Sequence, residues 1–200
     1  MTYGMLKRRV LELLTATEDG SVIEEEAADI IPRIPGGVNA ALILLATAGQ
    51  YVKKQCVLTP EQAEESDFRG EVLFDMAALC ESFHKVLLVE VQAGQGRKKI
   101  PHRTLGDKLI IGKLHQAPYY VLTYAAYCAP VTDETTDEEK FELSPEAAEV
   151  LPEYVCAYIG KDDQPEKVQQ WTYGWQEKFS LLRDKNQCSP VRVRNGFYYV

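Results

Sequence analysis

Features that support metal chemistry or membrane insertion are scarce in this sequence. It has no C-x-x-C pair, and two of its three histidines, His102 and His115, have no His or Cys companion at metal-site spacing. The longest apolar run, Ala40 to Ala46, is far shorter than the ~20 residues of a membrane-spanning helix. We therefore expect a protein without a metal, a cofactor or a membrane span.

Signals for secretion and for a disulfide framework are missing too. The first residues place Lys7, Arg8 and Arg9 after the first apolar side chains and contain no continuous apolar region, unlike a secretory signal. This pattern predicts a cytoplasmic protein. The cysteines are odd in number and widely spaced, which predicts free, mostly buried thiols. They are Cys56, Cys80, Cys128, Cys156 and Cys188.

The overall composition is that of a folded, acidic protein. Hydrophobic residues make up 46% of the 200 residues and charged residues 26%, which excludes wholesale disorder. The formal net charge is −8, which disfavours a sequence-independent duplex binder, because such binders rely on clustered Lys and Arg. The length accommodates one domain, with or without a sizeable insertion.

Helical periodicity dominates the N-terminal part. Apolar residues recur at helical spacing over Tyr3–Leu14 and predict a first helix of about a dozen residues. The acidic run Glu24–Glu26 favours a short second helix through Ile31. Pro32 and Pro35, with the two glycines that follow, are expected to interrupt it.

A third helical stripe runs from Val38 to Val52 and is apolar over most of its circumference. Such a helix must be buried on several sides. It is either the central core helix of the domain or, at Leu42 and Leu45, part of a contact with another subunit.

The middle of the chain has β character. Segments rich in Val, Leu, Ile and Tyr predict strands at 85–91, 108–111 and 118–126, and residues 71–76 are a fourth candidate. Glycines and a proline separate these segments. We predict a small sheet or a sandwich-like insertion.

Two capped helices follow the β region. Ser144-Pro145-Glu146 is typical of a helix start, which predicts a helix from Glu146 to Ile159. Pro152 lies within this range, so the alternative is an ordered helix that begins at Leu151 with Pro152 in its first turn. An aromatic stripe at three- and four-residue steps then predicts a long helix. It consists of Val168, Trp171, Trp175, Phe179 and Leu182. Further on, Asn195-Gly196 between two alternating runs predicts a type I′ hairpin.

One concentrated basic patch stands out in the acidic chain. It consists of Arg97, Lys98, Lys99, His102 and Arg103. The preceding Gly94 and Gly96 lead into Ile100-Pro101 rather than into a helix start, which disfavours a phosphate loop and predicts a hairpin turn. The patch either contacts DNA backbone or an acidic partner, or it protects an exposed sheet edge from aggregation.

No residue group forms a convincing catalytic set. Cys80 and His84 are four apart, which on a helix would pair a nucleophile with a base, yet no orienting acid accompanies them. The acidic run Asp133–Glu139 lacks the calcium-loop pattern and predicts a solvated, flexible connection. Trp171 and Trp175 have glutamine and glutamate neighbours, so we expect packing rather than base stacking.

Three segments, taken in order, resemble a known family. The first spans Arg33-Ile34-Pro35-Gly36, Asn39-Ala40-Ala41 and Leu45-Ala46-Thr47; the second has Tyr119-Tyr120, Tyr124, Pro130 and the Thr/Asp/Glu loop; the third runs from Leu143–Ala148 through Leu151–Val155 to Lys161-Asp162-Asp163 and the aromatic helix. This order is similar to that of the tailed-bacteriophage head-tail adaptors, also called connector or tail tubular proteins. The resemblance touches most of residues 1–183.

The resemblance implies an α+β fold, with a helical bundle formed by N- and C-terminal helices and a β-rich insertion in the middle. Residues 1–58 would supply the N-terminal helices, 71–130 the insertion and 144–184 the C-terminal helices. Residues 185–200 would form a tail or hairpin. In related adaptors an extended C-terminal arm docks onto the portal, which makes the tail an interface candidate through Val191, Val193, Phe197, Tyr198 and Tyr199.

The resemblance also implies a non-catalytic virion or prophage protein without a cofactor. It would form a ring, usually twelvefold, between the portal and a downstream tail or neck protein, in the virion neck and, before assembly, in the bacterial cytoplasm. The acidic charge suits a channel through which DNA slides without sequence-specific contact. The alternatives are a nucleic-acid-binding module that uses Arg97–Arg103 or a Cys-dependent enzyme that uses Cys80.

Overall fold

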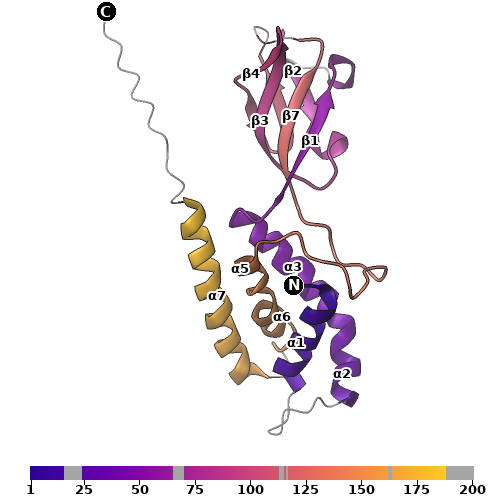
Figure 1. Cartoon of the computed structure of the whole chain (residues 1–200), viewed down its shortest axis with the longest axis vertical. Helices are drawn as coiled ribbons and strands as arrows, with labels where there is room; N and C mark the ends of the chain where they lie inside the picture. The colour runs from indigo at the N-terminus through magenta and orange to yellow at the C-terminus, as the bar shows by residue number, and fades with distance from the viewer. Residues whose placement is uncertain (16–23, 65–69, 113–114, 116, 162–163, 188–200) are drawn as a thin grey trace, which may run out of the picture. The chain divides into compact units, whose positions relative to one another are not determined.

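The chain folds into a mixed α+β structure, with helices at both ends and antiparallel sheets in the middle (Figure 1). The computed structural model describes residues 1–15, 24–64, 70–112, 115, 117–161 and 164–187. Two compact units are present: a helical unit, Met1–Gln50 with Val131–Val200, and a sheet unit, Tyr51–Pro130. Both ends of the chain therefore contribute to one unit, and the middle forms the other.

The helical unit is centred on a short apolar helix, α6. Its helices are α1 (Tyr3–Thr15), α2 (Glu24–Ile30), η1 (Ile31–Arg33), α3 (Ile34–Thr47), α5 (Pro145–Ala148), α6 (Leu151–Ile159) and α7 (Pro165–Gln187). Helix α6 packs against α1, α3 and α7 (Figure 1). It begins at Leu151 with Pro152 in its first turn, which is the second of the two predicted starts, and the Ser144 start belongs to a separate short helix, α5. Ser144 caps α5 by accepting a hydrogen bond from the Ala147 amide at 3.2 Å.

Helix α3 starts earlier than its sequence pattern predicts. The expected range was 38–52, with a break at Pro35 and the following glycines, but the helix spans Ile34–Thr47. Pro35 lies in the first turn, where its missing N–H has no helical partner to lose. Gly37 lies inside the helix. A Cβ at this position would be 3.2 Å from Cδ1 of Tyr158 in α6, which is closer than ordinary packing allows. Close contact between the two helices explains the glycine.

By length and composition alone, the stretch Ala27–Thr47 could cross a membrane, with a mean hydropathy of 1.5 over its best window. Buried core helices of folded proteins pass the same test. Within this stretch, Val38, Leu42 and Leu45 are buried against the rest of the helical unit. We therefore assign α3 to the core of that unit.

The acidic side chains of the loop before α5 are exposed, as the sequence predicts, and the loop backbone is hydrogen-bonded to the start of α1. The Tyr3 and Gly4 amides at the start of α1 donate hydrogen bonds to the carbonyls of Glu139 and Asp137, both at 2.9 Å. Asp137 also forms an ion pair with Lys7. Helix α1 has no acidic residue in its own first turn. The loop therefore supplies the acceptors and the negative charge that a helix N-terminus favours.

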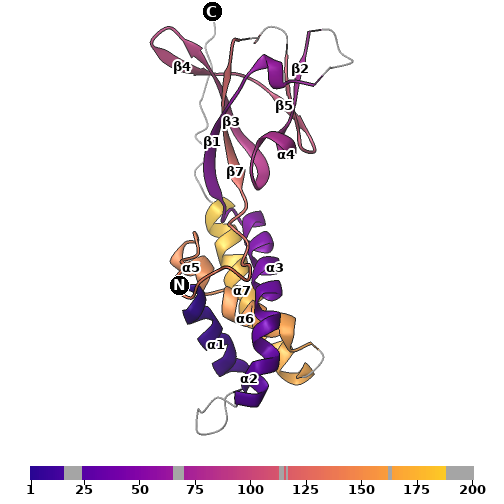
Figure 2. The ribbon, with the colours of Figure 1, turned by 90° about the vertical axis from the view of Figure 1, so that its right-hand side faces the viewer.

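The sheet unit contains two antiparallel sheets, ordered β1-β7-β3-β4 and β2-β6-β5 (Figure 2). Its elements are β1 (Val52–Leu58), η2 (Pro60–Gln62), β2 (Val72–Asp75), α4 (Met76–Leu79), β3 (Phe83–Ala93), β4 (Gly96–Lys99), β5 (Arg103–Leu105), β6 (Lys108–Ile111) and β7 (Tyr120–Ala126). Both sheets contribute to one hydrophobic core. In it, the fully buried Phe74 of β2 meets Tyr120 of β7 edge to face, with ring centroids 5.7 Å apart.

The predicted boundary of the β region is wrong at its N-terminal end. Residues 52–58 were grouped with the N-terminal helices, but they form β1, which pairs with β7 from Val52↔Ala126 to Leu58↔Tyr120. The alternation of this strand is concealed because Lys54 lies on the half-buried face, where its Nζ is 3.1 Å from Glu81 Oε2. A charged residue on the half-buried face of the strand interrupts the alternation of apolar and polar residues from which a strand is predicted.

A charged cluster caps α4 and predicts acid sensitivity of the sheet unit. Asp75 accepts hydrogen bonds from the Ala77 and Ala78 amides through Oδ1 and from Lys108 through Oδ2, the last at 2.8 Å. The hydrogen bond from Lys108, followed by those from the amides, lowers the pKa of Asp75. The charged Asp75 side chain stabilises the folded sheet unit fully at pH values above the unfolded-state pKa of ~3.9. This stabilisation is lost as pH falls through the lower pKa that Asp75 has in the folded state.

We expect Asp75→Asn to lower the melting temperature of the sheet unit near neutral pH and to converge with the wild type as pH falls below ~3.9 and through the lower folded-state pKa of Asp75. Thermal unfolding across that range measures the difference. Asp107→Asn is the matched control, because that side chain is exposed on the same unit. Equal acid dependence in both variants would contradict the role of Asp75.

Candidate functional site

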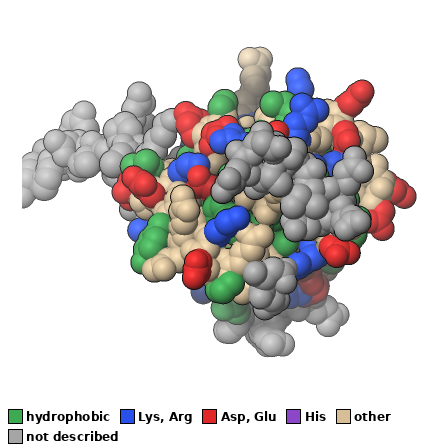
Figure 3. Space-filling view, turned by 90° about the horizontal axis from the view of Figure 1, so that it is seen from below, with side chains coloured by type: hydrophobic (Ala, Val, Ile, Leu, Met, Phe, Trp, Pro, Cys, Tyr) green, Lys and Arg blue, Asp and Glu red, His purple; other side chains and the backbone are tan. Residues whose placement is uncertain are grey.

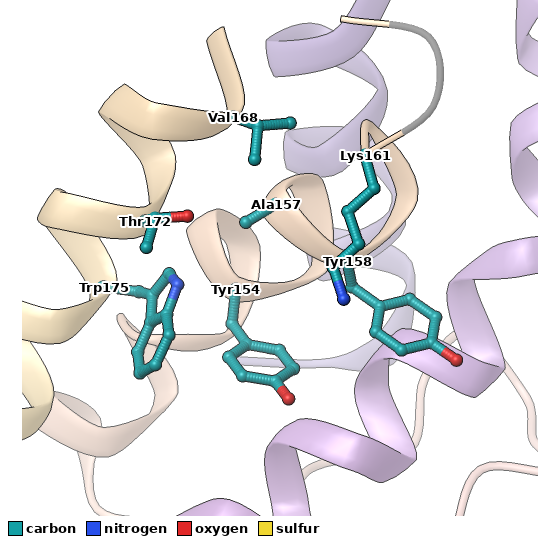
Figure 4. A pocket seen from close by; sticks show the side chains of 7 residues that line it. All are labelled: Tyr154, Ala157, Tyr158, Lys161, Val168, Thr172 and Trp175. Carbon is teal, nitrogen blue, oxygen red and sulfur yellow. The ribbon is translucent and has the colours of Figure 1, made fainter. Parts of the chain in front are cut away.

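A shallow aromatic groove lies between α6 and α7 in the helical unit. Its volume is ≈ 210 Å³. The lining side chains are Tyr154, Ala157, Tyr158, Lys161, Val168, Thr172 and Trp175 (Figure 4). Tyr154 and Trp175 pack edge to face with ring centroids 5.1 Å apart. The groove arises because the aromatic stripe of α7 faces the tyrosines of α6.

The groove has an apolar floor and one cationic side chain. Lys161 Nζ lies 5.7 Å from the centroid of the Tyr158 ring, within cation–π range, and Figure 4 shows both side chains at the same end of the groove. Burial, and then the neighbouring Tyr158, raise the pKa of Tyr154, so its phenol stays neutral in ordinary buffers. This combination suits the docking of an apolar or aromatic side chain from a partner.

The described residues show neither the helical Cys80–His84 pairing nor a metal-binding cluster. Cys80 follows the end of α4 and His84 lies in β3, so the helical pairing proposed from their spacing is wrong. His84 Nδ1 is instead 3.0 Å from the Tyr127 hydroxyl, and burial, followed by Lys85, lowers the pKa of His84. Among the described residues, no three His, Cys, Asp or Glu side chains are placed to hold a metal ion.

The basic patch divides between two sheets. Arg97, Lys98 and Lys99 are exposed on β4, which pairs with the end of β3 in the predicted hairpin. Gly94 in the turn has a φ of 61°, a conformation that favours glycine. Arg103 lies on β5 of the other sheet, and its Nη2 is 2.5 Å from Glu71 Oε1. The sequence cluster is therefore reduced to three exposed cations on one edge strand.

The predicted subunit-interface residues fall into two groups. Leu42 and Leu45 are only 3% and 0% exposed, so they belong to the core of the helical unit and are not available to a second subunit. This supports the core-helix alternative for α3. The tail candidates Val191, Val193, Phe197, Tyr198 and Tyr199, together with the predicted hairpin, lie outside the described residues.

The exposed surface of the helical unit carries several large apolar side chains. They are Met5, Leu13, Ile31, Ile43, Tyr158, Tyr173 and Leu181. On the face seen from below in Figure 3, green apolar side chains are scattered among acidic and basic ones. Helical periodicity marks the buried stripe, so it carries no signal for which of the remaining apolar residues serve a contact.

Comparison with models of known protein families gives no match, and comparison with curated proteins gives none at a significant level.

Proposed function

We propose that this chain is a head-tail adaptor of a tailed bacteriophage or prophage, a non-catalytic subunit that joins the DNA-filled head to the tail. The observation that carries the proposal is the order of its parts. Helices from both ends of the chain form one unit, and the antiparallel sheets between them form a second. The sequence resemblance to this family implies the same order, with the helices as a bundle and the sheets as its insertion.

In this proposal the helical unit is the bundle of the ring subunit. Helices α1, α3 and α7 pack on α6, and the loop at 131–142 is hydrogen-bonded to the start of α1. A closed ring needs two different complementary surfaces on each subunit, because each subunit contacts its neighbours head to tail. The aromatic groove between α6 and α7 provides a concave surface, and exposed apolar residues elsewhere on the unit provide projecting ones.

The proposed ring is twelvefold, as is usual in the family, and sits below the portal in the virion neck. Before assembly the subunit resides in the cytoplasm of the bacterial host. The net charge of −8 disfavours tight binding of DNA that passes through the channel. The downstream partner is a tail or neck protein, and no cofactor takes part.

Co-expression with the portal encoded beside it, followed by electron microscopy, tests this function. We expect rings on the portal. Tyr173 and Leu181 of α7 are 64% and 65% exposed, so Tyr173→Glu with Leu181→Glu is expected to weaken assembly at least tenfold without unfolding the chain. Gln176→Glu, an exposed position on the same helix, is the matched control. Absence of both rings and portal binding would overturn the proposal.

The nucleic-acid-binding alternative rests on β4, where Arg97, Lys98 and Lys99 are all exposed. It expects DNA binding that weakens steeply with salt and is lost when the three cations are changed to glutamine. The adaptor proposal expects no such binding. A DNA-binding titration of the wild-type protein at two salt concentrations separates the two functions.

A further inference from the structure

Two free cysteines face each other in the sheet unit. Cys56 lies on β1, Cys80 follows α4, and their Sγ atoms are 3.2 Å apart although the residues are 24 positions apart in sequence. Cys80 is 3% exposed, whereas Cys56 is half-buried. Cys56 is therefore the more exposed of the two residues, and the buried Cys80 thiol is in contact with its sulfur.

The backbone around both thiols is held in place by independent contacts. Cys56 is paired with Leu122 of β7, and the Cys80 amide donates to the Met76 carbonyl at 2.9 Å. Lys54 of β1 forms an ion pair with Glu81, the residue next to Cys80. A disulfide needs its sulfurs ~2.05 Å apart, so the two Sγ atoms have ~1.2 Å to close. Rotation of the two side chains supplies this displacement more easily than movement of β1 or of the segment after α4 does.

We propose that Cys56 and Cys80 are a disulfide site, which closes when the protein meets a small-molecule disulfide such as oxidised glutathione. The bond would crosslink β1, an edge strand of the four-stranded sheet, to the short segment between α4 and β3. This site is independent of the proposed function.

The reaction proceeds by two exchange steps. The Cys56 thiolate attacks one sulfur of oxidised glutathione, which forms a mixed disulfide and releases one glutathione thiolate. Cys80 then loses its proton and attacks the Cys56 sulfur, which forms the internal disulfide and releases the second glutathione thiolate. The two protons lost by the cysteines are taken up by the released thiolates. Two protein thiols are oxidised, and one molecule of oxidised glutathione is reduced to two thiols.

The environment of the pair supports this order of attack. The hydrogen bond between the two thiols, in which either sulfur can be the donor, lowers the pKa of Cys56. The same hydrogen bond, followed by burial, raises the pKa of Cys80 well above its usual value. The more exposed cysteine is thus also the better thiolate, as an attacking thiol requires. Cys80 then acts as the resolving thiol.

Mass spectrometry of the full-length protein tests the site directly. The chain carrying Cys188→Ser is reduced, treated with excess oxidised glutathione under native conditions, blocked with N-ethylmaleimide and digested with trypsin without reduction. Cleavage after Lys54, Arg69 and Lys85 places Cys56 on peptide 55–69 and Cys80 on peptide 70–85, each with one cysteine. We expect these two peptides linked in more than half of the molecules.

Recovery of both cysteines as maleimide adducts would overturn the proposal, as would a mixed disulfide at Cys56 that persists. So would linkage of either peptide to Cys128 or Cys156. These outcomes need no substitution at Cys56 or Cys80, so they hold even if a substitution at the buried Cys80 prevents folding.

Hydrogen exchange supplies a second readout. The disulfide would close a loop between two residues 24 positions apart. This closure is expected to slow exchange of the most protected amides of the sheet unit by roughly 10- to 100-fold. The fluorescence of Trp171 and Trp175, both in the helical unit, should be unchanged by oxidation. Cys56→Ser should abolish the slowing, and Cys128→Ser should keep it. Equal slowing in Cys56→Ser would contradict the assignment.

Discussion

Replacement of Phe74 by alanine is expected to unfold most of the sheet unit while leaving the helical unit folded. Phe74 is fully buried and packs edge to face on Tyr120 in the core that both sheets share. Removing such a ring costs about 3–5 kcal/mol, because apolar contacts are lost and a cavity remains. That loss is a large fraction of the ~5–15 kcal/mol that stabilises a whole domain.

Hydrogen exchange of peptides from Tyr51–Pro130 would measure the loss, and tryptophan fluorescence would follow the helical unit, which contains both tryptophans. Val57→Ala is the matched control, since Val57 is 56% exposed on β1 and should change stability by less than ~0.5 kcal/mol. Simultaneous loss of structure in both units would show that they unfold as one, contrary to this prediction.

Replacement of Asn39 by alanine is expected to destabilise the helical unit by about 2–4 kcal/mol. The Asn39 amide of α3 makes two hydrogen bonds to one residue: Nδ2 donates to the Val131 carbonyl at 2.9 Å, and Oδ1 accepts from the Val131 amide at 2.7 Å. Val131 is only 5% exposed. Alanine would leave both of its backbone groups buried without this partner, and each such group costs about 1–3 kcal/mol.

Thermal unfolding followed by tryptophan fluorescence should show a fall in midpoint of roughly 8–15 °C. Asn39→Leu restores most of the volume but neither hydrogen bond, so it should be destabilised to a similar extent. Ile43→Ala, at a 58% exposed position on the same helix, is the neutral control. Recovery of stability in Asn39→Leu would mean that packing, and not the two hydrogen bonds, secures this loop.

Elements whose signal lies within their own residues were predicted well. Strand β6 has the predicted bounds, 108–111, because a short apolar run there is bounded by glycines. The stripe from Trp171 to Leu182 forms part of α7, with both of those residues buried, because a period of 3.6 places them on one face. In each case local chemistry agrees with the final packing.

Elements whose surroundings come from elsewhere in the chain were missed. The β1 strand pairs with β7, almost seventy residues later, and the acidic loop is hydrogen-bonded to the start of α1. For the candidate site, sequence reasoning foresaw that Trp175 packs but did not identify the groove, because the groove exists only where α7 meets α6. Leu42 and Leu45 are a second example. Their apolar stripe predicts burial, but it does not indicate whether they are buried by the same chain or by another subunit.

By itself, the sequence determined the class of the fold, the helices at both ends, most strands and the hairpin at Gly94, because propensity, capping and periodicity act over a few residues. Only the tertiary structure decided that Asn39 holds Val131 and that Cys56 meets Cys80. These pairs are 92 and 24 positions apart. Side-chain hydrogen bonds and thiol contacts over such separations depend on how whole elements pack, and no local pattern encodes that packing.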